Sequence, residues 1–566
     1  MTLDENLLKV QISTAEASAW EFKNRRINEW DETYMLYRDR VRINRLTQRQ
    51  SVNVPLMKET ISTIMSSIDD APDIKFEDKG NDKQKEIYIN EFWNNDMLRC
   101  NLELKDVIDK KQVLLFGRSF MQLNIVDNEI TLEVIDPKYI LVGSFVDPAD
   151  IDSARYLCHI GIYKSIGELK ENLLYNQAKV SKIALSLGNI AGTVEADRIA
   201  EESEAQKQRY EDIGISDSTA FGQTGETKVE LKHHFIKVWD TDEKRSRIVF
   251  IAEGAGEYLR IAFLEDIMNI NFFPYVTWSN DPERTDFWSD GIGDIVRTPN
   301  KIMNAWFSQL VENRTMRSMG MNYYNASDTS FRPDTFIAQP WGWYPVPGDP
   351  NTIIKRIDIP ELSESIDEME YVKTMTERAT AATASEKGQK VEGQVTLGEV
   401  KIMKSAAQER ITSTAKFYKI ARKQLAEKWL KIIEANGKNI NAETLYKKSA
   451  QGNYYPEKVS PNMWKSNEGY SVLVTSSAEQ EDKNLDTIQK FQAVVSQFQN
   501  NYALSKIYKK KMLGLINLTP EEENEVMQSE ENAINQANMM AGNVPPNPVD
   551  EALATQTKQL INPNQV

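Results

Sequence analysis

The sequence predicts an α+β protein that is mainly helical. Three observations predict this class: long segments with apolar residues at helical spacing, a middle stretch that alternates with period two, and a late helix of more than thirty residues. The chain has 566 residues, 40% of them hydrophobic and 9% aromatic, which is enough for two to four domains with real cores.

Composition excludes several classes of protein. The chain carries 68 Lys and Arg against 84 Asp and Glu, a net charge of -16, which argues against a broad basic face that wraps nucleic acid. Two cysteines, Cys100 and Cys158, cannot form a disulfide framework and suit a reducing compartment. No apolar run approaches the roughly 20 residues of a membrane-spanning helix, and the start MTLDENLLKVQ shows no signal peptide. A large intracellular-type protein is expected.

The first hundred residues are predicted to be helical. Residues 15–43 carry one apolar stripe, and residues 59–68 and 83–115 continue in the same manner. The stripe of the first segment consists of Trp20, Ile27, Trp30, Tyr34, Tyr37 and Val41.

Period-two alternation then predicts strands. The first two, 119–126 and 129–135, are joined by Asp127-Asn128 and form a predicted hairpin. Residues 195–226 hold nine acidic and three basic residues, which is typical of a solvated insertion or mobile loop. The remaining predicted strands are 139–142, 155–163, 229–239, 247–252, 258–263 and 273–278.

The second half alternates between long helices and irregular segments. A helix is expected to about residue 319, then an aromatic and proline-rich module with short strands, then a helix over 363–382. Residues 384–398 (ASEKGQKVEGQVTLG) predict a functional or disordered loop. The helix that follows, 400–433, is the strongest periodic segment and stops at Asn436-Gly437. Further expected elements are strands near 470–474, helices at 486–498, 504–513 and 521–540, and a flexible tail from 541.

A search for catalytic chemistry finds little. The sequence has no P-loop, no G-x-S-x-G elbow and no H-E-x-x-H helix. His233 and His234 are adjacent in a strand and point to opposite faces, so core or surface packing is favoured over metal ligation, and Cys158 beside His159 is predicted to be an inert buried thiol.

One acidic cluster is the strongest candidate for a metal site. The favoured alternative is that its last two members lie near a helix N-terminus, where negative charge is stabilised. The cluster consists of Asp281, Glu283, Asp286, Asp290 and Asp294. We therefore expect no catalytic residue, no metal site and no cofactor.

Two features indicate nucleic acid. The segment from Lys401 to Lys431 has nine basic and two acidic residues, and the glycine-rich loop before it carries Lys387 and Lys390. Such charge contacts phosphates without reading sequence. The alternative for the helix is a solvated face, or a face that pairs with acidic neighbours of the same protein, and this alternative is favoured.

The order of these parts resembles the portal proteins of tailed bacteriophages, also called head-to-tail connectors. Two stretches support the resemblance locally: GRSFMQLNIVDNEITLEVIDPKYILV (117–142) and FFPYVTWSNDPERTDFWSDGIGDIVRTPNKIMNAW (272–306). The helix–loop–helix over 363–433 resembles the second stem helix, the tunnel loop and the long wing helix of that family. Residues 195–226 have no counterpart there, and the C-terminal part is shorter than in portals with a long helical barrel.

The resemblance implies a portal-type fold with a wing, a stem, a clip and a crown. By position these would be the N-terminal helices and α/β wing at 1–293, the stem helices at 294–319 and 363–383, the clip at 320–362, the tunnel loop at 384–398, the long wing helix and wing strands at 399–478, the crown at 479–540 and the tail at 541–566.

It further implies a dodecameric ring at one vertex of the virion capsid, assembled in the host cytoplasm, through which double-stranded DNA is packaged and ejected. The expected partners are other copies of the chain, DNA bound without sequence specificity, the terminase large subunit, a head–tail adaptor or tail protein, and the major capsid and scaffolding proteins. No membrane is expected.

Two sets of residues follow from these assignments. The tunnel-loop candidates for DNA contact are Lys387, Gly388, Lys390, Gly393 and Gly398, whose glycines would let the loop change shape. The clip candidates for subunit or adaptor contacts are Trp341, Trp343 and Tyr344, with a small local core as the equal alternative. The competing functions are a nucleic-acid motor or nuclease that uses the helix 401–431, and a helical scaffold or adaptor protein.

Overall fold

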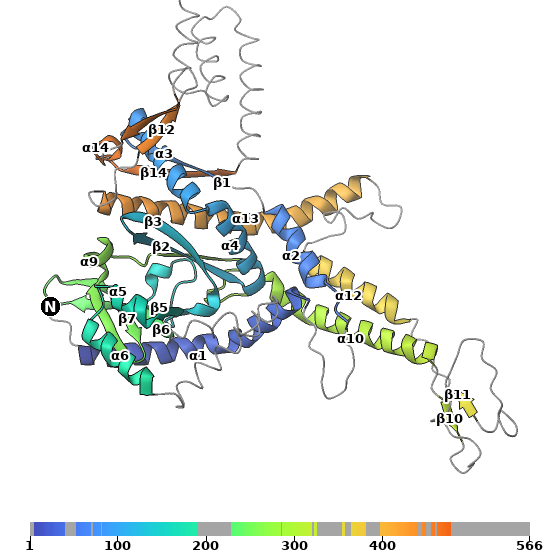
Figure 1. Cartoon of the computed structure of the whole chain (residues 1–566). Helices are drawn as coiled ribbons and strands as arrows, with labels where there is room; N and C mark the ends of the chain where they lie inside the picture. The colour runs from blue at the N-terminus through green and yellow to red at the C-terminus, as the bar shows by residue number, and fades with distance from the viewer. Residues whose placement is uncertain are drawn as a thin grey trace, which may run out of the picture. The chain divides into compact units, whose positions relative to one another are not determined.

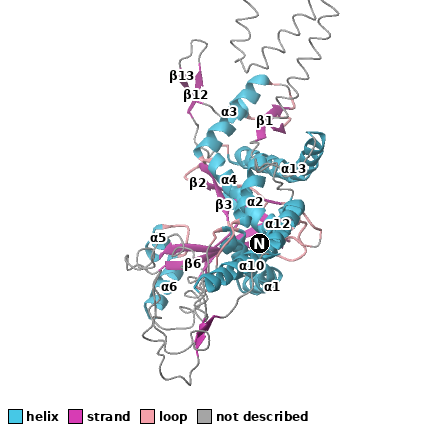
Figure 2. Cartoon of the chain, turned by 90° about the vertical axis from the view of Figure 1, so that its right-hand side faces the viewer, coloured by secondary structure: helices cyan, strands magenta, loops and turns pink. Residues whose placement is uncertain are grey.

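The computed structural model describes residues 5–39, 52–68, 72–80, 82–189, 228–284, 286–319, 322–324, 354–356, 364–380, 397–437, 444–448, 454–458 and 461–476. These residues form helices and antiparallel sheets (Figure 1; Figure 2), which agrees with the predicted α+β class. Residues up to 442, together with 460–474, belong to one compact unit, and the hairpin of β12 (Thr444–Lys448) and β13 (Tyr454–Lys458) belongs to a second. The segment 195–226 lies outside the described residues, as does everything after residue 476.

The larger sheet has five antiparallel strands in the order β4-β5-β6-β7-β8. All five were predicted from the alternating pattern, with ends that differ by a few residues. Their bounds are β4 (Ile140–Val142), β5 (Tyr156–Ser165), β6 (Lys228–Asp240), β7 (Arg245–Gly254) and β8 (Glu257–Phe263).

A three-stranded sheet, β3-β2-β9, is formed by β2 (Arg118–Val126), β3 (Glu129–Ile135) and β9 (Tyr275–Ser279). The predicted hairpin is confirmed: Asp127 and Asn128 have φ of 51° and 65°, the left-handed pair that a two-residue type I′ turn requires. Phe235 of β6 packs edge-on against Tyr275, 5.5 Å between ring centroids, so the two sheets share a core.

Helix α1 (Glu5–Tyr37) covers the other face of the five-stranded sheet (Figure 1), where Leu8, Ile12 and Ala19 join a core with strand residues such as Val249. The prediction of a helix here is confirmed, but it starts ten residues earlier than expected. Of the predicted stripe, Trp30 is fully buried, Trp20, Ile27, Tyr34 and Tyr37 are partly buried, and Val41 lies outside the described residues. The prediction missed three buried polar positions beside that stripe, Lys23, Arg26 and Thr33.

Lys23 is fully buried without a carboxylate partner. Its Nζ donates to the carbonyl oxygens of Lys138 and Ile140, both at 2.6 Å, and lies 5.3 to 5.9 Å from the ring centroids of Trp20, Trp30 and Trp288. Burial lowers the pKa of Lys23 to about 7, because these neutral partners do not replace the hydration of the ammonium group.

The predicted continuous helix over 83–115 is interrupted. Helix α3 (Lys83–Arg99) ends before Asn101, which has φ of 52°, and α4 (Leu102–Phe116) begins after it. No glycine or proline marks the break, so periodicity alone extended one helix across it. Strand β1 (Pro72–Asp78), which was not predicted, pairs with β14 (Tyr470–Ser476).

Three long helices follow the sheets: α10 (Ile292–Met319), α12 (Glu364–Thr380) and α13 (Leu397–Asn436). All three were predicted within three residues at each end, and α13 stops at Asn436 as expected. Helices α10 and α12 lie side by side (Figure 1; Figure 2). The short elements are α2 (Leu56–Ser67), η1 (Pro137–Tyr139), η2 (Ile151–Ser153), α5 (Ile166–Glu171), α6 (Gln177–Asn189), α9 (Leu264–Met268), β10 (Asn322–Tyr324), β11 (Ile354–Arg356) and α14 (Pro461–Trp464).

Candidate functional site

The candidate site is the helical pair α10–α12 and its attachment to the sheets. Helix α10 begins against the end of α4, where backbone meets backbone. A Cβ at Gly293 would lie 2.5 Å from the Leu115 carbonyl oxygen, and one at Gly291 would lie 2.6 Å from the backbone nitrogen of Gly117. Only glycine permits this approach, so the sequences GRS and DGIGD are joined in space at the start of α10.

Arg26 of α1 fixes the same junction. Its guanidinium lies 2.8 Å from Asp290 and 2.9 Å from Asp294, and it donates to the Ser289 carbonyl oxygen at 2.7 Å. The Asp294 carboxylate also accepts the backbone N–H of Gly291 at 3.0 Å. Burial raises the pKa of Asp294, and Arg26 opposes that shift. Asp290 and Asp294 thus lie at a helix N-terminus, which confirms the favoured interpretation of the acidic cluster.

A strap made of residues 52–55 and the first turn of α2 runs along α10 beyond Pro299, the proline inside that helix. The side-chain oxygens of Asn300, Asn304 and Ser308 accept the backbone N–H groups of Met57, Val54 and Val52, at 2.8, 2.8 and 3.0 Å respectively. Since the three side chains are four residues apart, they form one row on the helix and hold the strap alongside it, with the two segments running in opposite directions.

Another face of α10 is exposed and mainly uncharged. Its members follow the spacings 3, 4, 3, 4 and 7, the pattern of a helix that packs against another helix, and Glu312 occupies the one heptad position that the last spacing passes over. They are Ile295, Thr298, Ile302, Ala305, Gln309 and Met316, called here the α10 stripe. Ile295 and Ile302 are 42% and 38% exposed, so none of the described elements covers this face. On α12, Tyr371 and Met375 are also exposed, at 66% and 48%.

Helix α13 uses part of its positive charge inside the protein. Arg422 is 2% exposed and lies 2.6 Å from both Asp106 and Asp109 of α4. Burial alone would lower the pKa of Arg422, but the two carboxylates raise it above its ordinary value. Tyr418 donates to Asp106, and the Trp278 indole donates to Asp109 at 2.7 Å. The cluster ties α13 to α4 and β9.

Lys428 is used in the same way. Its Nζ donates to the carbonyl oxygens of Phe273 and Tyr275 at 2.9 and 2.8 Å and pairs with Asp152 at 2.8 Å. The basic helix therefore pairs partly with acidic neighbours of the same protein, the alternative that the sequence favoured. Lys416, Lys423 and Lys431 remain exposed, and the side chains of 397–412 lie outside the described set.

The predicted site residues fall mostly outside the described part. Two groups of predicted site residues lie outside the described part: the loop residues Lys387, Gly388, Lys390 and Gly393, and the clip residues Trp341, Trp343 and Tyr344. Gly398 was predicted as the last residue of the loop, but α13 starts at Leu397, so its backbone belongs to the first turn of that helix.

The histidines point to opposite faces as predicted. His234 faces α1. Its Nδ1 shares a hydrogen bond of 2.9 Å with the Tyr156 hydroxyl, and its Nε2 lies 2.9 Å from the Glu253 carboxylate. Burial opposes the charge on His234, yet Cys158 and Glu253 raise its pKa to about 10. His233 and His159 pack on the other face, and Cys158 is fully buried as predicted. The described residues hold no group of three or more His, Cys, Asp or Glu side chains suited to a metal ion.

Sequence reasoning missed the attachment of α10. Arg26 looked like a solvent-facing residue because Asp290 and Asp294, its partners at the start of α10, lie more than 260 positions away. The row Asn300, Asn304, Ser308 has helical spacing, but polar residues with that spacing usually face water. Neither signal identifies its partner without the fold.

The described elements follow the order that suggested a phage portal protein: sheets, a long helical pair and a longer helix after it. The family model described as Phage SU10 portal protein matches residues 44–559, and the chain belongs to this family. No curated protein matches the chain. In the part of the chain that is described, no helix has the length and apolar character needed to cross a bilayer.

Proposed function

We propose that the chain assembles into a ring at one capsid vertex, through which double-stranded DNA enters and leaves the head. Family membership supports the portal role. The observation that carries the ring is the α10 stripe: an exposed face with heptad spacing on which Ile295, Ile302 and Met316 face solvent. Leaving such a face in water is unfavourable, and a second helix is the partner that its spacing fits.

A closed ring needs two different faces on each copy. The described parts of α10 contain Arg297, Lys301, Arg314 and Arg317 against two acids, whereas α12 contains five acids against two bases. We infer that the α10 stripe of one copy packs against the face of α12 that carries Tyr371 and Met375 in the next. Opposite charge at the rims would then favour this head-to-tail contact over a symmetric pair.

The proposal assigns the parts by position as the sequence indicated. Helices α10 and α12 are the stem, 320–362 is the clip, 384–398 is the tunnel loop, and 479–540 is the crown. A net charge of -16 repels DNA, so the chain would let it slide while Lys387 and Lys390 contact phosphates briefly. Trp341, Trp343 and Tyr344 would contact neighbouring copies or an adaptor.

The same proposal gives the partners and the place of action. The ring would receive the terminase large subunit during packaging and an adaptor or tail protein afterwards, and it would contact capsid and scaffolding proteins during assembly. It would be a structural component of the virion with no active site of its own, since the motor protein hydrolyses ATP.

Electron microscopy with light scattering on the purified full chain tests this function. Twelve copies of 64.8 kDa give a ring of about 780 kDa around an open channel. Ile302→Glu places a charge in the α10 stripe and should leave monomers, whereas Leu185→Glu, the same charge at an exposed aliphatic residue of α6, should leave rings. A small closed oligomer without a channel, or rings that persist in Ile302→Glu, would contradict the proposal.

A further inference from the structure

Phe145, in the loop between β4 and β5, combines a strained backbone with a fully exposed aromatic ring. Its φ is 64°, a left-handed conformation that glycine adopts readily and that is strained for a bulky residue. No part of the ring is covered by the described residues. An exposed ring adds nothing to the stability of a single copy, and the strain reduces that stability. A side chain kept under these conditions points to a role outside the copy that carries it.

The chain is fixed on both sides of Phe145. The Ser144 hydroxyl lies 3.3 Å from the Ser18 hydroxyl of α1, and Val146 is buried. One residue further, the backbone N–H of Asp147 donates to the Ser153 hydroxyl at 2.8 Å. The ring is therefore held in a set position, as in the preorganised aromatic anchors of protein–protein interfaces.

The surroundings of Phe145 are acidic. Residues 143–153 contain three acids and no base. Asp147 and Asp150 are exposed, whereas Asp152 pairs with Lys428 at 2.8 Å. An apolar surface with a positive rim is the complement of such an anchor.

Helix α4 carries an exposed apolar surface of this kind. Leu104, Val107 and Ile108 are all exposed, and their spacing of three and four residues places them on one face of the helix. These three residues are called here the α4 patch. Large apolar side chains that gather on one exposed face are typical of a surface that another protein covers.

Cations outnumber acids at the rim of the α4 patch. Lys105 and Lys111 lie one turn before and one turn after Ile108, against the single acid Glu103. The rim is thus positive, opposite in sign to the loop of Phe145.

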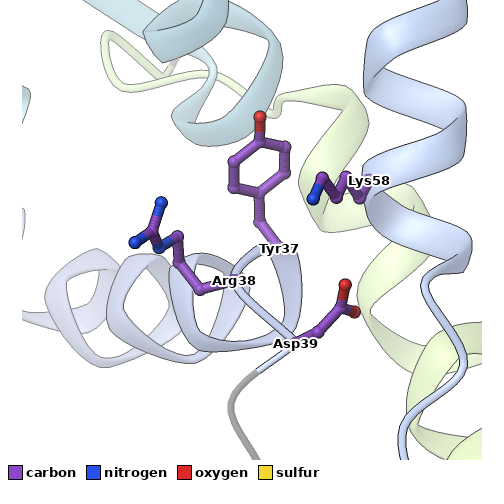
Figure 3. A pocket seen from close by; sticks show the side chains of 4 residues that line it. All are labelled: Tyr37, Arg38, Asp39 and Lys58. Carbon is purple, nitrogen blue, oxygen red and sulfur yellow. The ribbon is translucent and has the colours of Figure 1, made fainter. Parts of the chain in front are cut away.

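A polar pocket of about 430 Å³ adds to this positive charge. The Lys111 Nζ lies 5.9 Å from the centre of the Tyr37 ring, and Tyr37 lines the pocket together with Arg38, Asp39 and Lys58 (Figure 3). Arg38 and Lys58 lie on opposite sides of the Tyr37 ring, so they do not converge on one ligand. They contribute two further cations, against one acid, near the end of the patch.

The anchor and the patch belong to opposite edges of the three-stranded sheet β3-β2-β9. The loop of Phe145 is fixed beside β9, because Asp152 accepts the backbone N–H of Phe273 at 2.8 Å and η2 contacts β9. The α4 patch lies toward β3, where Lys105 donates to the Leu132 carbonyl oxygen. Two complementary surfaces at opposite edges suit a head-to-tail contact between copies.

We propose that Phe145 of one copy packs on the α4 patch of the next copy in the ring, with Asp147 and Asp150 facing the cations of the rim. The inference rests on the proposed function. A phenylalanine side chain buries about 150–250 Å², well below the roughly 800 Å² per partner of a stable interface. The contact therefore forms only between copies that the α10 stripe already holds together.

Cross-linking of the full chain tests which surfaces meet. The native Cys100 and Cys158 are buried, so new cysteines can be labelled selectively. The double variant Phe145→Cys with Ile108→Cys, treated with a short bismaleimide, should give a ladder of bands beyond the dimer, because each copy is joined to two neighbours. Either single variant should stay monomeric on a denaturing gel. The control pair, Phe145→Cys with Leu174→Cys, uses another exposed leucine and should give no ladder.

Phe145→Gly separates a contact between copies from a role within one copy. Glycine relieves the left-handed backbone, so below the concentration at which rings form the variant should unfold at the same or a higher urea concentration than the parent. The protein concentration at which half of the copies are in rings should rise about tenfold or more, the usual effect of truncating an interface anchor. Trp239→Ser removes another exposed aromatic side chain and should leave that concentration unchanged.

Four outcomes would overturn the contact: rings of the double variant that do not cross-link, a cross-link within one copy, dimers from either single variant, or unchanged ring formation in Phe145→Gly. Rings of the parent chain are scored in parallel by electron microscopy. If the parent forms rings, any of these outcomes refutes the contact and leaves the portal function standing. A parent chain without rings refutes the proposed ring itself.

Discussion

Replacement of Lys23 by methionine should change how the stability of the unit depends on pH. Methionine keeps most of the buried volume and removes the charge. The pKa of Lys23 falls from 10.5 in the unfolded chain to about 7 in the fold, so between these values the unfolded state binds more protons and stability rises with pH. From pH 7 to pH 9 this single residue contributes a gain of about 2 kcal/mol.

His234 acts in the opposite direction over the same interval. Its pKa rises from 6.5 to about 10 on folding, so its contribution is fully present below pH 6.5 and is lost as the pH rises through 10. The loss between pH 7 and pH 9 is also about 2 kcal/mol. In the parent chain the gain from Lys23 and the loss from His234 nearly cancel between pH 7 and pH 9. In Lys23→Met the loss from His234 remains without that gain.

Urea unfolding at pH 7 and pH 9, followed by tryptophan fluorescence, measures this because Trp20, Trp30 and Trp288 surround Lys23. The free energy of unfolding of the parent minus that of Lys23→Met should rise by about 2 kcal/mol between pH 7 and pH 9. All other groups titrate alike in both proteins, so their contributions cancel in this difference. A difference that stays constant between pH 7 and pH 9 would show that Lys23 does not lose its proton in the fold, and would refute the reasoning.

Three further changes test the attachments of the long helices. Arg422→Ala leaves the buried Asp109 carboxylate without its ion-pair partner, while Asp106 keeps Lys110, and should cost about 3–5 kcal/mol by urea unfolding; a loss below 1 kcal/mol would contradict the buried cluster. Gly293→Ala should lower the melting temperature and the yield of folded protein, with a cost above about 1 kcal/mol, and an unchanged melting temperature would refute the close approach to α4. Asn304→Ala removes one acceptor of the strap and should cost about 1 kcal/mol; hydrogen exchange of residues 52–57 should speed up, and protection equal to that of the parent would count against the row.

The sequence predicted the periodic parts of the fold well. Asp127-Asn128 specified its hairpin, and the glycine and asparagine at 436–437 specified the end of α13, because these signals act within a few residues. The break at Asn101 was missed because its left-handed backbone has no glycine to announce it. Strand β1 was missed because its partner, β14, lies almost 400 residues away.

Burial of charge was the harder problem. Lys23, Arg26 and Arg422 are buried because carbonyl and carboxylate oxygens from distant segments surround them. Hydropathy assigns such residues to the surface, and so the predicted face of α1 lacked Lys23 and Arg26. The predicted DNA and adaptor contacts stay predictions, since their residues lie outside the described part.

The strap on α10 has a mechanical consequence. Pro299 has no N–H to donate to the turn before it, so α10 would bend most easily there. The row of Asn300, Asn304 and Ser308 starts at the very next residue and joins a second length of chain to the following two turns. The helix is thus supported by the strap after its weakest point and held by the close glycine contacts before it, so that bending is confined to the turn around Pro299. A load on the far end of α10 would pivot the helix there as a stiff lever instead of curving it along its length.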